Sequence, residues 1–300
     1  MDKAVISTKK LSKYYGKTRG IHKLNITINE GEVFGFLGPN GAGKTTTIRT
    51  LLDFIRPTNG KAQIFDLDSH SSSVKIKNYI GYLPGDLSAY QNLTGQQFLK
   101  YMANLRNQVD FKYVKKLARD FKCNLNIKIN KLSHGNKQKI SIINAFMHKP
   151  KLLILDEPTT GLDPLMQQQF YELVNNARKE KRTVFISSHN LPEVQRICDR
   201  VAFIRAGKLI DTKEISELAK WSLHRLEIHF KSIPNKSVFW SVSGIEHLNI
   251  AGKIAHVTVK GSLTPLLKAI SRYEVIDLIT HELDLEDVFF NYYEKGKNVV

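Results

Sequence analysis

The sequence predicts an α/β protein with a mostly parallel sheet, followed by a smaller α+β domain. Two observations predict the first part: strand-like apolar runs alternate with helix-spaced segments, and a glycine-rich turn joins one such run to the helix behind it. The third observation is a change of character near Trp221, after which a few strands and helices follow in a neutral segment. These observations predict a main domain at residues 1–220 and a second domain at 221–300.

The N-terminal elements are predicted to be strands. The segment "AVISTKKLSKYY" (4–15) contains β-branched and aromatic residues, and "LNITIN" (24–29) alternates apolar with polar side chains. The run "EVFGFLGPNGAGKTTTIRTLLDFI" (32–55) then predicts a strand, a glycine turn and a helix. Two further strand-like segments, "GKAQIF" (60–65) and "IGYL" (80–83), flank a serine-rich stretch.

The middle of the chain is predicted to be helical, and strands alternate with helices after it. Helical periodicity extends over about 94–150, as in "QQFLKYMANL" and "YVKKLARDF". The elements that follow are "KLLILDE" (151–157, strand), "LMQQQFYELVNNARKE" (165–180, helix), "TVFISSH" (183–189, strand), "LPEVQRIC" (191–198, helix) and "RVAFIRAGKLI" (200–210, strand or hairpin). This alternation favours a parallel sheet.

The C-terminal domain is predicted from weaker patterns. A helix at "EISELAK" (214–220) leads into it. The segments "HRLEIHF" (224–230) and "KIAHVTVKG" (253–261) resemble strands, whereas "LTPLLKAISRY" (263–273) and "LEDVFFNYYEK" (285–295) resemble helices.

Composition and charge narrow the classes of partner. The formal net charge is +17; residues 71–150 hold fourteen basic and three acidic side chains, whereas residues 221–300 hold nine of each. Nucleic acid, an anionic membrane surface and an acidic protein surface could each bind such a basic segment, and a solvated helical surface is the alternative. The two cysteines, Cys123 and Cys198, give no disulfide framework or zinc-ligand spacing. No apolar run reaches the ~18 residues of a membrane span and no signal peptide is recognised, so we expect any membrane role to be peripheral.

A phosphate-binding loop is the strongest chemical signal. Gly38, Gly43, Lys44 and Thr45 form G-x-x-x-x-G-K-[ST] between a strand and a helix. The glycines let backbone N–H groups point at phosphate oxygens, and the helix N-terminus adds partial positive charge. Lys44 is expected to neutralise the β and γ oxygens, and the Thr45 hydroxyl to bind Mg²⁺.

Two further strands are predicted to bring acid–base groups to the same edge of the sheet. In "LLILDEP", Asp156 follows a buried strand and is expected to orient Mg²⁺, and Glu157 is expected to accept a proton from the attacking water. A solvent or helix-capping carboxylate is the alternative for Glu157. His189 ends another apolar strand, where it could reach the γ-phosphate or serve only a structural role.

In this order, the motifs resemble the ATP-binding subunit of ABC transporters over residues 3 to 215. Gly38 to Thr46 resembles the Walker A loop, "LLILDE" the Walker B strand, "GLD" (161–163) the D-loop and His189 the switch histidine. "LSHGNKQK" (132–139) lies where the family has its signature motif. Tyr15 resembles the aromatic residue that stacks on adenine, with Tyr14 as the alternative and strand packing as a third reading. The resemblance implies a P-loop NTPase (RecA-like) core with an antiparallel β subdomain and a helical subdomain at about 86–150. The residues it implies for ATP are Tyr15, Gly38, Pro39, Asn40, Gly41, Ala42, Gly43, Lys44, Thr45, Thr46, Ser133, Gly135 and Asp163.

The resemblance also implies partners and a reaction. Two cassettes, as a homodimer or with a paired homologue, pack head to tail, so that Ser133 and the Gly135 N–H contact the γ-phosphate held by the other cassette. Asp163 is expected at the same interface. ATP with Mg²⁺ is then hydrolysed to ADP and phosphate to power a separate integral-membrane permease from the cytoplasmic face of the cell membrane. Anionic lipid is a further candidate contact for the basic segment, and nucleic acid is not expected.

Two departures from the family pattern carry consequences. The signature usually reads Leu-Ser-Gly-Gly-Gln, and here His134 and Asn136 replace the third and fifth residues. In "IGYLPGDLSAY", Gly85 stands where the family has a glutamine that touches Mg²⁺ or water. Asp86 or Gln91 could substitute, or the loop could couple only mechanically.

The second domain also resembles a known type, and two functions compete. Residues 221–300 resemble the accessory domain of bacterial drug, peptide and antibiotic-resistance exporters, for which dimer contact, regulation and passive stabilisation are all open. The leading function is export of a drug, an antimicrobial or amphipathic peptide, or a lipid-like substrate. The alternative is a soluble ABC ATPase that acts on ribosomes or nucleic acid.

Overall fold

The computed structural model describes residues 3–85, 90, 92–106, 109–220 and 223–281 of the 300. The chain divides into two compact units, Met1–Thr212 and Lys213–Val300. This division lies before helix α8 (Ile215–Lys220), whereas the sequence placed a boundary after it. The domain boundary predicted between residues 220 and 221 therefore stays a prediction.

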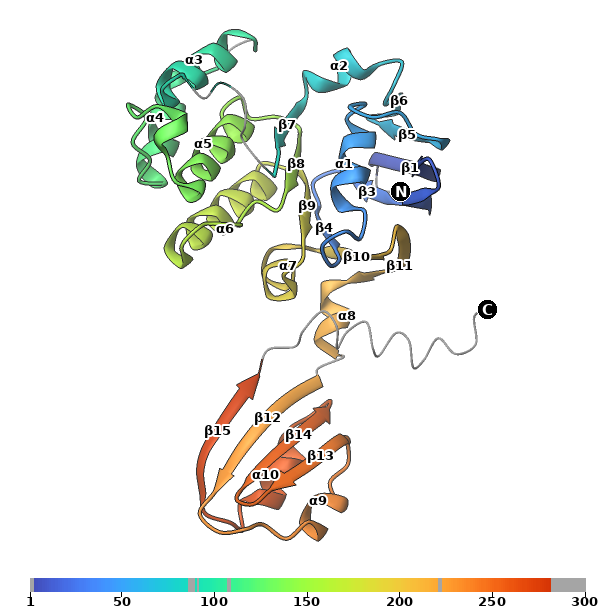
Figure 1. Cartoon of the computed structure of the whole chain (residues 1–300), viewed down its shortest axis with the longest axis vertical. Coiled ribbons are helices and arrows are strands. Elements are labelled where there is room, and N and C mark those ends of the chain that lie inside the picture. The colour runs from blue at the N-terminus through green and yellow to red at the C-terminus, as the bar shows by residue number, and fades with distance from the viewer. Residues whose placement is uncertain (1–2, 86–89, 91, 107–108, 221–222, 282–300) are drawn as a thin grey trace. The chain divides into compact units, whose positions relative to one another are not determined.

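The first unit is built on a six-stranded sheet in the order β11-β10-β4-β9-β8-β7 (Figure 1). Five of its strands pair in parallel, as the alternation of strands and helices predicted. Strands β4, β8 and β9 are buried along their whole length, which matches their uninterrupted apolar runs. The strands are β4 (Val33–Leu37), β7 (Ile80–Leu83), β8 (Leu152–Asp156), β9 (Thr183–Ser188), β10 (Arg200–Arg205) and β11 (Lys208–Glu214).

A five-stranded antiparallel sheet forms the N-terminal part of this unit. Its strands are β1 (Ala4–Tyr15), β2 (Thr18–Leu24), β3 (Thr27–Asn29), β5 (Asn59–Ile64) and β6 (Leu67–Asp68), in the order β2-β1-β5-β6 with β3 paired to β1. Helix α1 (Lys44–Leu51) follows the phosphate loop and contacts strands of both sheets.

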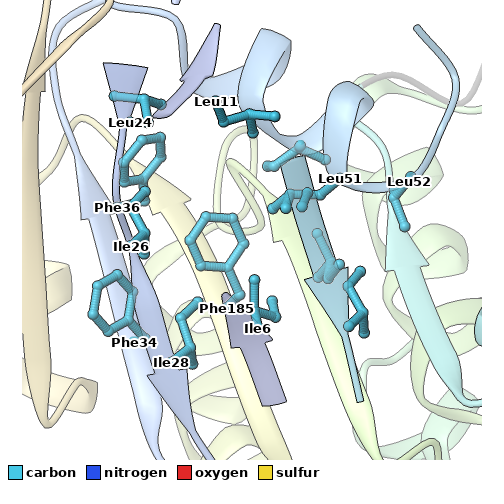
Figure 2. Close-up of a cluster of buried hydrophobic side chains, with 14 of the residues drawn as sticks. Ile6, Leu11, Leu24, Ile26, Ile28, Phe34, Phe36, Leu51, Leu52 and Phe185 are labelled. Carbon is cyan, nitrogen blue, oxygen red and sulfur yellow. The ribbon is translucent and has the colours of Figure 1, made fainter. Parts of the chain in front are cut away.

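One apolar cluster joins these two sheets to α1 (Figure 2). Ile6, Leu11 and Ile28 come from the antiparallel sheet, and Phe34, Phe36 and Phe185 from β4 and β9; all six side chains are fully buried. Leu51 adds the helix to the cluster. Because α1 is packed from both sides, the loop before it is held against a rigid frame.

The helical part follows at residues 94–146. Helix α3 (Gly95–Asn104) begins with a capping box between Thr94 and Gln97, Asp110 caps α4 (Phe111–Asp120), and Ser133 caps α5 (His134–Phe146). Both α3 and α4 contact α5. The remaining helices of this unit are α2 (Ser73–Lys77), a 3₁₀ turn (Ile129–Lys131), α6 (Pro164–Lys179) and α7 (Leu191–Ile197).

The second unit contains a four-stranded antiparallel sheet with its own core. The strands are β12 (Leu223–Phe230), β13 (Ile245–Ala251), β14 (Ile254–Lys260) and β15 (Val275–His281), in the order β13-β14-β12-β15. With α9 (Ser237–Trp240) and α10 (Thr264–Ile270) this is a ferredoxin-like arrangement. Strands β12 and β14 and helix α10 were predicted, but β13, β15 and α9 were not. The helix expected at 285–295 lies outside the described residues.

Within the described ranges, no helix has both the length and the apolarity needed to cross a membrane.

Candidate functional site

The loop between β4 and α1 has the backbone conformation that a phosphate cradle needs. Gly41 and Gly43 have φ of 78° and 107°, a region that side chains disfavour. A Cβ at Gly38 would lie 2.3 Å from the carbonyl oxygen of Ile204, so only glycine fits at the start of the loop. Among the predicted loop residues, Pro39, Asn40 and Gly41 are exposed. The loop therefore presents its backbone to solvent where the sequence predicted phosphate binding.

Lys44 lies inside this loop. Its side chain is buried, and Nζ donates hydrogen bonds to the carbonyl oxygens of Gly38 (2.6 Å) and Pro39 (3.1 Å). Nζ also lies 3.1 Å from Oε1 of Glu157, within ion-pair distance. Oε1 makes no directed hydrogen bond, so the contact is mainly electrostatic. The ammonium group is thus placed among acceptors that phosphate oxygens could replace.

Asp156 and Thr45 form the predicted metal corner. The Thr45 hydroxyl donates to Asp156 Oδ2 (2.8 Å), and the Ser187 hydroxyl donates to Asp156 Oδ1 (2.5 Å). Asp156 is buried, but Thr45 is exposed at the start of α1. A carboxylate and a hydroxyl are hard oxygen donors, and Mg²⁺ in phosphate sites uses one or two carboxylates with waters and substrate oxygens. The donor set fits Mg²⁺.

Glu157 is held by contacts at both carboxylate oxygens. Oε2 lies 2.8 Å from Nδ1 of His189, and Oε1 faces Lys44. About half of the His189 side chain is exposed, whereas the Glu157 side chain is largely shielded. The structure therefore brings together Lys44 from the start of α1, Glu157 from directly after β8 and His189 from directly after β9.

Glu193 is a buried carboxylate beside this group that the sequence did not reveal. It accepts a hydrogen bond from the Ser188 hydroxyl (2.6 Å), and burial raises its pKa above the usual range. The backbone carbonyl of Ser188 accepts from the Gly38 N–H (3.1 Å). Glu193 thus braces the end of β9 where it meets the phosphate loop. The "SSHNLPE" spacing offered no signal beyond a helix N-terminus.

The two adjacent tyrosines have different surroundings. A Cβ at Gly20 would lie 3.0 Å from Tyr15 Cε2 and 3.1 Å from Thr46 Cγ2, so the Tyr15 ring lies beside the phosphate loop. Tyr15 is half exposed, which leaves ring surface for stacking. The Tyr14 hydroxyl is instead bonded to His22 Nδ1 at 2.6 Å. This geometry favours Tyr15 over Tyr14 for the adenine role, which stays a prediction.

The signature residues are not part of this cluster. Ser133 is exposed and caps α5 through the Asn136 N–H (3.4 Å). A Cβ at Gly135 would lie 2.3 Å from the carbonyl oxygen of Gly161, so the signature packs against the D-loop. Asp163 is exposed and caps α6 through the Met166 N–H (3.0 Å). Among the described residues, the Ser133 and Asp163 side chains bond backbone N–H groups of the helices they cap, and both remain exposed to solvent.

Gly85 lies close to the metal corner. A Cβ there would be 3.9 Å from Asp156 Oδ2, with no other described atom within 4 Å. The departure from the family pattern is thus next to the predicted Mg²⁺ ligand. The proposed substitutes Asp86 and Gln91 lie outside the described residues.

Gln138, within the signature stretch, contacts the site although the sequence did not predict it as a site residue. Its side chain is buried, and Nε2 donates to the carbonyl oxygens of Glu157 (3.1 Å) and Pro158 (2.9 Å). The sequence shows it only as one polar residue between lysines.

Comparison with known proteins shows a consistent family. The ABC transporter family model matches residues 21–160. The bacitracin transport ATP-binding protein BcrA of Bacillus licheniformis is 34% identical over 299 residues, covering 95% of this chain and 96% of that protein. The probable multidrug ABC transporter ATP-binding protein YbhF of Escherichia coli is 34% identical over 211 residues, covering 69% of this chain and 36% of YbhF.

Solved structures show the same fold. An ATP-binding subunit of an ABC transporter has a TM-score of 0.67 and 26% identity, covering 71% of this chain and 91% of that one. The dimeric bacterial ABC transporter cassette MJ0796 has a TM-score of 0.65 and 21% identity, covering 70% and 98% of the two chains.

Proposed function

Because this chain belongs to the ATP-binding proteins of the ABC transporter family, we propose that its ATPase cycle runs on the residues assembled around Lys44 and drives a separate membrane permease. The observation that carries the proposal is the meeting of Lys44, Glu157 and His189 beside the phosphate loop. In this assignment Lys44 binds the β- and γ-phosphates, Glu157 is the general base and His189 contacts the γ-phosphate.

The ion pair between Lys44 and Glu157 suggests how ATP prepares the base. Phosphate oxygens compete with Glu157 Oε1 for the Lys44 ammonium, so binding would free one carboxylate oxygen to accept a proton from water. His189 would keep the other oxygen in place, since Nδ1 is 2.8 Å away. Mg²⁺ on Asp156 and Thr45 would supply charge neutralisation to the phosphates.

The site of one chain would be completed by a second cassette. Ser133 and Gly135 lie at the start of α5 and Asp163 at the start of α6. A head-to-tail dimer would put Ser133 and the Gly135 N–H on the γ-phosphate of the other chain, with Asp163 at the interface. ATP binding would close this dimer and exclude water, and hydrolysis would reopen it.

The relatives suggest the class of cargo. Their names refer to bacitracin transport and to multidrug transport. We assign this chain to the export of a drug, an antimicrobial or amphipathic peptide, or a lipid-like substrate, at the cytoplasmic face of the membrane.

Helix α4 provides a basic surface for this location. Its apolar side chains Val114 and Leu117 are buried, while Lys112, Lys115 and Arg119 line a shallow surface hollow with Lys122. An anionic lipid surface or an acidic face of the permease would complement this charge. Reversal of Lys112, Lys115 and Arg119 to Glu should weaken salt-sensitive association with the permease-containing membrane; unchanged association would argue against this surface.

Turnover with and without the permease tests the proposed function. The wild-type chain should release phosphate from MgATP faster when its permease is present in membranes, and Lys44→Ala should lower turnover by roughly 100-fold or more. Equal ATP turnover with and without the permease, or wild-type turnover in Lys44→Ala, would contradict the proposal.

A further inference from the structure

Gln138 connects helix α5 to the loop that follows β8. It is only 3% exposed, and its Nε2 donates to two successive carbonyl oxygens, those of Glu157 (3.1 Å) and Pro158 (2.9 Å). The amide has two N–H groups, so both can be used in this contact. A buried polar side chain whose donors both bind one backbone segment restrains that segment strongly.

The segment that Gln138 binds has an unusual conformation. Glu157 has φ of 49°, in the left-handed region that residues with a side chain seldom adopt. Such a conformation persists only where the surroundings enforce it, and it occurs often at functional sites. At Glu157 the restraint comes from two sides: its N–H bonds the Ser187 carbonyl (3.2 Å), and its carbonyl accepts from Gln138.

The backbone conformation of Glu157 determines where its carboxylate lies. With this φ, Oε2 reaches His189 Nδ1 and Oε1 reaches Lys44 Nζ. A return of Glu157 to ordinary strand or helix geometry would rotate its Cα–Cβ bond and move the carboxylate away from both partners.

We infer that Gln138 is a positioning residue for the general base: it holds the left-handed backbone at Glu157 and thereby aims the Glu157 carboxylate at the attacking water. This inference rests on the proposed role of Glu157 and names a residue that the family motifs described above do not assign.

The same helix gives this contact a second consequence. Helix α5 begins at His134 with Ser133 as its N-cap, and at Gly135 it approaches the carbonyl oxygen of Gly161 so closely that no Cβ fits. The start of α5 is therefore fixed to the loop after β8 at two points, Gly135 and Gln138. Displacement of Ser133 when the second cassette closes would be transmitted to Glu157 through Gln138.

A double-mutant cycle tests the inference. Gln138→Met keeps the side-chain length and removes both donors. We expect kcat for MgATP hydrolysis to fall roughly 10- to 100-fold, because a displacement of about 1 Å in a catalytic group has an effect of this size. The KM for ATP and the affinity for MgADP should change less than about twofold, since the phosphate loop is untouched. In a Glu157→Gln background, the added Gln138→Met change should lower the residual turnover no further, because the base through which Gln138 acts is already absent.

Matched variants separate positioning from general damage to the fold. Ser141→Ala alters another buried side chain of α5 whose hydroxyl has no partner among the described residues, and its kcat should stay close to wild type. If Gln138→Met fails to fold, Gln138→Leu, which has a similar volume, carries no charge and also lacks the amide donors, takes its place in the cycle.

The outcomes test the role of Glu157 as the base and the role of Gln138 as its positioning residue separately. Full turnover in Glu157→Gln would overturn the proposed base itself. Loss of turnover in Glu157→Gln together with a normal kcat in Gln138→Met, or with fully additive losses in the double variant, would overturn the positioning role alone.

Discussion

Replacement of Gly85 by glutamine should add a side chain that can hydrogen-bond at the metal corner formed by Asp156 and Thr45. A Cβ at this position lies 3.9 Å from Asp156 Oδ2 and meets no other described atom within 4 Å, so the backbone can accept a side chain. The introduced amide would extend from that point to the carboxylate or to water around the metal. A hydrogen bond to a charged group contributes about 1.5–3 kcal/mol. If it forms in the transition state, kcat should rise roughly 10- to 100-fold.

Phosphate release measured over a range of Mg²⁺ concentrations would detect this gain. Gly85→Gln should raise kcat, lower the Mg²⁺ concentration for half-maximal rate, or both. Gly85→Ala is the matched control, because it adds only the Cβ at ordinary contact distance and should behave like wild type. Identical rates in Gly85→Gln and Gly85→Ala would show that a side chain at this position does not reach the metal.

Three further changes have defined outcomes. His189→Ala removes the 2.8 Å contact to Glu157 Oε2 and should lower kcat roughly 100-fold while isothermal titration shows unchanged MgADP affinity; a normal kcat would argue against its role. Gly135→Ala places a Cβ 2.3 Å from the Gly161 carbonyl oxygen and should lower the free energy of unfolding by about 1–3 kcal/mol. Urea titrations measure this change, and an unchanged free energy of unfolding would show that the two segments are not packed this closely. Burial lowers the pKa of His148 to about 4, so unfolding takes up a proton below pH 6.5. The free energy of unfolding should therefore decline by up to about 3 kcal/mol between pH 6.5 and 4. In thermal melts, His148→Gln should weaken this dependence of the unfolding free energy on pH.

Much of the catalytic side was predictable because its signals are local. The spacing of Gly38, Gly43 and Lys44 and the apolar run before Asp156 each lie within a few residues, and parallel strands bring their carboxyl ends to one edge. The structure confirms the parallel sheet, the antiparallel subdomain and the helical segment.

The features that escaped prediction depend on contacts between distant segments. Gln138 gains its meaning from carbonyl groups 19 and 20 residues further along the chain, and no pattern in "LSHGNKQK" marks that contact. Glu193 is distinguished by burial against Ser188 rather than by its sequence position. Strands β13 and β15 mix polar and apolar side chains because one face of their sheet is exposed, so their alternation was too weak to recognise.

We propose Glu157 as the general base of an ATPase whose site a second cassette completes. Glu157→Gln tests it directly, because the amide keeps the size of the side chain but cannot accept the proton from water. With MgATP, this variant should lose phosphate release and run as a stable dimer in size-exclusion chromatography, whereas the wild type returns to monomer as ATP is consumed. Sustained phosphate release by Glu157→Gln would rule out its role as the base, and a monomer at saturating MgATP would rule out completion of the site by a second cassette.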